Sequence, residues 1–127
     1  MPDDTWVDRP VVLIVDDDPS VLLLIDVLAE RLGFRTKAAS SGLQALELLR
    51  EGVRPAVILL DLMMERIDGV TFLNHLHEID EVRETPIVAM STPAVLERYV
   101  PQLQVDGVLS KPITPQTLEA CLTRFKA

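Results

Sequence analysis

The sequence AVILLDLMMERIDG, residues 56–69, decides the fold of this chain. It opens with an apolar run, residues 56–60, that is too short to span a membrane. Pro55 precedes the run and a polar loop follows it, which is typical of a strand buried on both faces of a parallel sheet. Asp61 ends the run, and open α/β sheets bind ligands at the carboxyl ends of their central strands. The common alternative role for such an aspartate is a helix N-cap or a turn.

Length and charge limit the possible functions. The chain has 127 residues, enough for one domain that buries roughly two thirds of its unfolded surface. Its net charge of −8 argues against nucleic-acid binding, which needs a basic face, but it is compatible with a divalent cation or a basic protein partner.

Cys121 is the only cysteine, so no internal disulfide can form, and we expect an inert, buried thiol. Residues 1–10 form a polar lead-in without a signal-peptide pattern, so we expect a cytoplasmic protein without a membrane segment.

Strand and helix patterns alternate five times along the chain. This alternation predicts an α/β fold, a parallel sheet with helices on both faces and right-handed crossovers. The predicted strands cover residues 11–15, 34–38, 56–60, 86–90 and 108–109, and the predicted helices follow them at 19–31, 42–51, 69–79, 93–100 and 115–125.

Capping residues and apolar spacing define the helices. Asp18 before Pro19 and Thr114 before Pro115 are typical helix starts, and Ser41 with Gln44 forms a capping-box pattern. The helical spacing predicts inward positions for Val21, Leu24, Ile25, Leu28 and Leu32 in the first helix and for Leu43, Leu46 and Leu49 in the second.

Chemically active side chains follow four of the five predicted strands. They are Asp16 and Asp17 after the first strand, Asp61 after the third, Ser91 after the fourth and Lys111 after the fifth. Crowded carboxylates repel one another unless a cation joins them, and hard oxygen ligands favour Mg²⁺. A cation, a lysine and a hydroxyl around one carboxylate suit phosphoryl transfer, with Asp61 as the nucleophile.

The chain resembles the receiver domain of bacterial two-component response regulators from residue 11 to residue 125. The matching pieces are LIVDDDPS at 13–20, LLDLMMERIDG at 59–69, PIVAMS at 86–91 and SKP at 110–112. The resemblance implies a flavodoxin-like, doubly wound sheet of strand order 2-1-3-4-5 and a receiver domain over residues 11–127. It also implies a phosphoacceptor signalling domain rather than an enzyme, although such domains catalyse their own phosphorylation and dephosphorylation.

The resemblance also assigns roles to individual residues. Asp61 would accept a phosphoryl group from a histidine of a sensor histidine kinase or a histidine phosphotransfer protein, and a downstream protein target would sense the change. Asp17 would bind Mg²⁺ directly, Asp16 through water, and the Met63 carbonyl would be a further ligand beside Asp61. Ser91 and Lys111 would contact the phosphoryl group, and the Lys111–Pro112 bond would be cis.

Three residues depart from the family pattern. Glu65 replaces a usual proline, Thr92 replaces a usual alanine beside the site, and Val108 replaces the aromatic residue that takes part in the family's output switch. Val108 has no ring to swing inward, so we expect the output switch to differ from the family's.

Two other functions are compatible with parts of the sequence. An aspartyl phosphatase of the haloacid-dehalogenase type would carry a second aspartate two residues after the nucleophile, where this chain has Met63. A binding module that works without phosphorylation would keep the fold and lose the switch.

Overall fold

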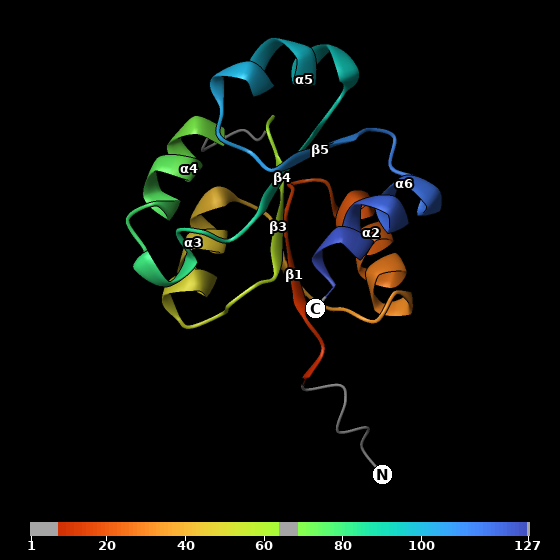
Figure 1. The fold of residues 1–127 in the computed structure, drawn as a ribbon, viewed down its shortest axis with the longest axis horizontal. Coiled ribbons are helices and arrows are strands. Elements are labelled where there is room, and N and C mark those ends of the chain that lie inside the picture. Colours follow the sequence, from red (N-terminus) through yellow and green to blue (C-terminus); the bar gives the residue numbers. More distant parts are fainter. Residues whose placement is uncertain (1–7, 64–68, 127) are drawn as a thin grey trace.

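The computed structural model describes residues 8–63 and 69–126. At its centre is a parallel sheet of strand order β2-β1-β3-β4-β5, which confirms the predicted fold (Figure 1). The strands are β1 Val11–Val15, β2 Arg35–Ala39, β3 Val57–Asp61, β4 Ile87–Ser91 and β5 Gly107–Ser110.

Helices cover both faces of the sheet. They are α2 Pro19–Arg31, α3 Gly42–Arg50, α4 Gly69–Leu76, α5 Pro93–Tyr99 and α6 Pro115–Leu122, with short 3₁₀ turns at Asp80–Val82, Val100–Gln102 and Thr123–Phe125. Helices α2 and α6 lie together on one side of the sheet, and α3 and α4 lie on the other (Figure 1). Helix α5 belongs with α3 and α4, because Leu96 packs into their hydrophobic cluster.

The central strand β3 contributes to two separate cores. Ile58 and Leu60 point into the cluster under α3 and α4, whereas Val57 and Leu59 point into the cluster under α2 and α6. Every residue of β3 is buried, which explains why residues 57–60 are continuously apolar instead of alternating.

Several predicted boundaries were wrong by a few residues. Strand β2 begins at Arg35 and not at residue 34, because the Phe34 N–H donates to the Ala29 carbonyl and closes the end of α2. The predicted strands 56–60 and 86–90 both lie one residue later, and β5 is longer than predicted. Helix α4 ends at Leu76 and not at 79, and half-buried Ile79 lies between it and the 3₁₀ turn at Asp80–Val82.

Two residues that we predicted to point inward are exposed. Leu24 on α2 is 39% exposed, and Leu43 on α3 is 55% exposed. Helix α2 packs through fully buried Ile25 and Ala29, so its contact face is narrower than its apolar sequence suggests. Leu24 therefore joins Leu23 and Val27 on a solvent-facing apolar ridge.

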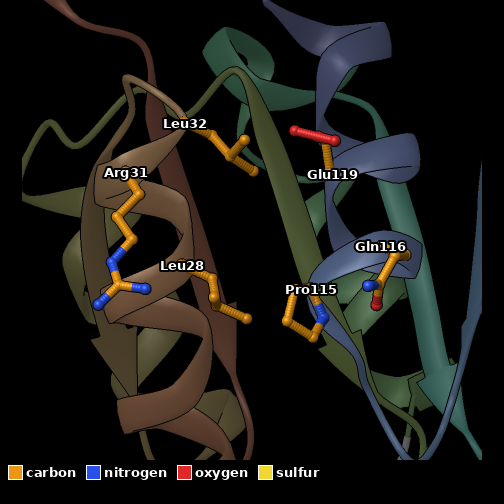
Figure 2. Close-up of a pocket in the computed structure, with 6 residues that line it drawn as sticks. All are labelled: Leu28, Arg31, Leu32, Pro115, Gln116 and Glu119. Atoms are coloured by element: carbon orange, nitrogen blue, oxygen red, sulfur yellow. The ribbon is translucent and has the colours of Figure 1, made fainter.

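A groove of about 270 Å³ separates α2 from α6. Its walls are Leu28 and Arg31 on α2, Leu32 directly after α2, and Pro115, Gln116 and Glu119 on α6 (Figure 2). The groove contains none of the side chains that the sequence assigns to a functional site. Cys121 of α6 is buried, as predicted, and burial raises the pKa of its thiol, which favours the unreactive protonated form.

No helix within the described ranges is long and apolar enough to cross a membrane.

We expect Leu59→Ala to lower the free energy of unfolding by about 2–5 kcal/mol, because Leu59 is fully buried and its loss leaves a cavity. Leu23→Ala is the matched control, since Leu23 is 64% exposed and its loss should change stability by about 0.5 kcal/mol or less. Urea unfolding of the two variants measures both values. Equal losses would contradict the two-sided core.

Candidate functional site

The predicted site residues meet at one edge of the sheet. Asp16 directly follows β1, Asp61 is the last residue of β3, Ser91 is the last residue of β4, and Lys111 directly follows β5. The strand register explains the meeting, since Asp61 lies opposite Met90, and Ser91 lies opposite Ser110.

The short loop between β1 and α2 fixes the first two aspartates. Asp18 caps α2, with its carboxylate accepting the Ser20 N–H at 2.9 Å. The Asp18 N–H in turn donates to Asp16 Oδ1 at 2.9 Å. The predicted helix start is therefore confirmed, and the same residue orients the Asp16 carboxylate.

Three carboxylates form the core of the site. Asp16, Asp17 and Asp61 each offer one oxygen atom, and these atoms lie within 4.8 Å of one another. Asp16 and Asp61 are buried, whereas Asp17 is exposed. The two buried carboxylates and the exposed one can therefore bind the same ion, which can enter from the solvent side.

Lys111 supplies the positive charge of the cluster. Its Nζ lies 2.8 Å from Asp16 Oδ2 and 3.5 Å from Asp61 Oδ2. Three carboxylates and one ammonium sum to a formal charge of −3 + 1 = −2. The cluster therefore has the charge that a single divalent cation would neutralise.

Burial and neighbouring charges shift two pKa values. Burial raises the pKa of Asp61 above its ordinary value, and the nearby Asp16 charge adds to the rise, while the Met63 N–H at 3.1 Å and the Lys111 ammonium only partly oppose it. Burial alone would lower the pKa of Lys111, but the hydrogen bond to Asp16 and the charges of Asp61 and Asp16 outweigh it and raise that pKa. Lys111 therefore stays protonated at neutral pH.

Ser91 and Lys111 are linked through the backbone. The Lys111 N–H donates to the Ser91 carbonyl at 2.8 Å, and the Ser91 side chain is buried at the same edge. The Lys111–Pro112 peptide bond is cis, as the resemblance implied.

Two of the three residues that depart from the family pattern lie in or next to the strands that bring Ser91 and Lys111 to the site: Thr92 directly follows β4, and Val108 lies in β5. Val108 is 52% exposed and lies opposite Ala89, on the face of the sheet that α3 and α4 cover. Thr92 is exposed and precedes α5. Glu65 lies outside the residues that the structure describes.

One contact of the site was not predicted. The sequence grouped Asp16 with Lys111, but it gave no reason to expect that Asp16, rather than Asp61, would hold the ammonium more closely. The two residues are 95 positions apart, and no spacing rule connects side chains on different strands. The capping motif at Asp18 was the only local signal for the orientation of Asp16.

Comparison with known proteins identifies the family. The model of the response regulator receiver domain matches residues 12–123. The chain belongs to this family. Receiver domains are signalling domains of two-component systems rather than conventional enzymes, so neither the phosphatase nor the phosphorylation-independent module is favoured.

Individual relatives resemble the whole receiver domain. The polar-differentiation response regulator DivK of Brucella anthropi is 33% identical over 111 residues, which are 85% of this chain and 89% of that protein. The chemotaxis response regulator CheY4 of Vibrio cholerae superimposes with a TM-score of 0.83 at 27% identity, covering 92% of this chain and 98% of that one.

A third relative was solved with a metal ion. It is the receiver domain of the sensor histidine kinase PA1611 of Pseudomonas aeruginosa, with magnesium coordinated in its active-site cleft. Its TM-score is 0.81 at 25% identity, and the match covers 92% of this chain and 97% of that one.

The carboxylates of this receiver domain fit a Mg²⁺ ion. They provide hard oxygen ligands within reach of one point, and their charge with Lys111 is −2. One side chain of the three is exposed, so a cation that keeps several of its waters can be accommodated.

We expect Asp61→Asn to stabilise the metal-free receiver domain and to raise its Tm. Because the folded-state pKa of Asp61 is raised, the folded protein binds more protons than the unfolded chain between about pH 3.9 and that raised value. The contribution of Asp61 to the free energy of unfolding therefore falls as the pH rises through that window and stays low at neutral pH. Asparagine carries no charge, so the variant does not lose this stability.

Thermal unfolding in the presence of a chelator checks this prediction. Added Mg²⁺ should stabilise the wild type more than the variant, because a ligand stabilises the state that binds it. A metal-free variant that unfolds below the wild type would show that the Asp61 charge is not a cost to the fold.

Proposed function

We propose that this receiver domain is the phosphoacceptor of a two-component pathway and that Asp61 is the residue phosphorylated. The observation that carries the proposal is the buried Asp61 carboxylate, which ends the central strand with the Lys111 ammonium 3.5 Å away. A carboxylate that is desolvated and next to a fixed cation is suited to attack a phosphoryl group, since charge on the transferred oxygens is neutralised as it develops.

The chemistry is a transfer between a histidine and Asp61. A carboxylate oxygen of Asp61 attacks the phosphorus of a phosphohistidine, a P–O bond forms as the P–N bond breaks, and the imidazole leaves with the bonding electrons. Lys111 holds positive charge next to the transferred oxygens, and the Ser91 hydroxyl donates a hydrogen bond to one of them. These residues position the group and neutralise it.

A Mg²⁺ ion completes the proposed site, where it would add positive charge beside the phosphoryl oxygens. We assign Asp17 as a direct ligand and Asp16 as a ligand through water, with Asp61 and the Met63 carbonyl as the remaining protein ligands. The support is the convergence of three carboxylate oxygens within 4.8 Å.

The partners follow from the same proposal. A cytoplasmic sensor histidine kinase or histidine phosphotransfer protein donates the phosphoryl group, and a downstream protein responds to the phosphorylated form. Residues 11–127 would carry this function, with residues 1–10 as a lead-in. Exposed Val108 supports an output change that differs from the family's aromatic switch, and this part stays a prediction.

Incubation with acetyl phosphate and Mg²⁺ should add one phosphate to the protein. Intact-mass measurement detects it, and a chelator should suppress it. Asp61→Asn should remove the added mass, because the amide is not a nucleophile. Asp80→Asn is the matched control, because Asp80 is exposed and pairs with Arg83 instead of with the site residues. This variant should be phosphorylated like the wild type. Phosphate that persists in Asp61→Asn would refute the assignment.

Thr92→Ala should shorten the half-life of the phosphorylated form by about twofold or more, equivalent to about 0.4 kcal/mol in the barrier. Thr92 is exposed directly after Ser91, so its side chain narrows the approach of water without providing a base. Ala94→Thr, two residues further along the same segment and also exposed, is a control for general effects on α5. An unchanged or longer half-life in Thr92→Ala would count against this role.

A further inference from the structure

We infer that Asp16 is a positioning residue for Lys111, holding the lysine side chain across the edge of the sheet so that its ammonium faces Asp61 before a phosphodonor arrives. The inference rests on the proposed phosphorylation of Asp61. It assigns Asp16 a role beyond that of a water-mediated metal ligand.

The distances favour Asp16 as the main partner of the lysine. The Nζ atom is 2.8 Å from Asp16 Oδ2, a full charge-assisted hydrogen bond, but it is 3.5 Å from Asp61 Oδ2. The ammonium is thus held by Asp16 and presented to Asp61, which keeps the Asp61 carboxylate less tightly occupied.

The strand order explains why this hold matters. In the order β2-β1-β3-β4-β5, Lys111 follows the edge strand β5 and Asp16 follows β1. Two strands lie between them, β4 and then β3, which ends in Asp61. A lysine side chain that reaches Asp16 must therefore cross the end of β3. The backbone of Lys111 is held beside β4, since the Lys111 N–H donates to the Ser91 carbonyl at 2.8 Å. The backbone and the ammonium of this lysine are therefore both held, and the side chain between them passes over Asp61.

The hydrogen bonds of Asp16 fit this role better than a direct metal role. Oδ1 accepts the Asp18 N–H at 2.9 Å, and Oδ2 accepts the lysine at 2.8 Å. Both oxygens of this fully buried carboxylate are therefore occupied at short distance. Asp17 is exposed. The two neighbouring aspartates therefore have different roles, because Asp17 binds the cation and Asp16 binds the lysine ammonium.

The position of the lysine can be measured without any phosphorylation. The chain has three lysines, Lys37, Lys111 and Lys126, so the ¹⁵N-labelled ammonium groups give three resolvable NMR signals. In the metal-free wild type, the Lys111 signal should be protected from solvent exchange at least tenfold more than those of exposed Lys37 and Lys126. Asp16→Asn should abolish this protection, Asp16→Glu should retain part of it, and Asp17→Asn should leave it unchanged.

A double-mutant cycle then tests the functional consequence. Rates of phosphorylation by acetyl phosphate are measured at saturating Mg²⁺ for Asp16→Asn, Lys111→Met and the double variant. If Asp16 acts through Lys111, its loss should slow the wild type at least tenfold but change the Lys111→Met protein less than twofold. The matched pair of Asp17→Asn with Lys111→Met should instead show independent, multiplicative losses. Backbone amide spectra of each variant confirm that it is folded.

Two results would overturn the inference. One is Lys111 protection that survives Asp16→Asn, and the other is an equal slowing by Asp16→Asn in both backgrounds. Failure of the proposed function looks different, because the wild type itself would then take up no phosphate on Asp61, whatever the lysine signals show.

Discussion

The burial of a carboxylate at the end of the central strand is the constraint on which the rest of the structure depends. Strand β3 is covered on both faces, so Asp61 cannot turn to solvent and must remain beside Asp16. Two buried carboxylates without a cation would cost several kcal/mol in desolvation and repulsion. The long reach of Lys111 from the edge strand and the backbone N–H groups of Asp18 and Met63 reduce that cost.

Lys111 and the two backbone N–H groups neutralise only part of the negative charge of the carboxylates, which suits a site that binds a cation. The cluster keeps a formal charge of −2, and the pKa of Asp61 remains raised. A fully neutralised cluster would have no electrostatic reason to bind a divalent cation. The site therefore combines a stable fold with unsatisfied negative charge at one edge of the sheet.

The sequence was sufficient for the fold because its patterns are local. Buried strands appear as continuous apolar runs, and helix starts appear as capping residues, so the parallel sheet and the convergence of Asp16, Asp61, Ser91 and Lys111 could be predicted from the residues themselves. The strand order came only from the resemblance to receiver domains. The exposure of Leu24 and Leu43 could not be, because helical spacing identifies an apolar face but not how much of it the sheet covers. The pairing of Lys111 with Asp16 depends on a side chain that reaches past the ends of β4 and β3, which no linear pattern contains.

The apolar ridge of Leu23, Leu24 and Val27 on α2 has a consequence for handling the protein in solution. A net charge of −8 keeps separate molecules apart at low ionic strength, but salt shortens the range of that repulsion to about 10 Å at 0.1 M and about 3 Å at 1 M. Concentrated salt leaves the attraction between exposed leucines in place while it removes the barrier to their approach. Colloidal stability should therefore decrease, not increase, as salt is added.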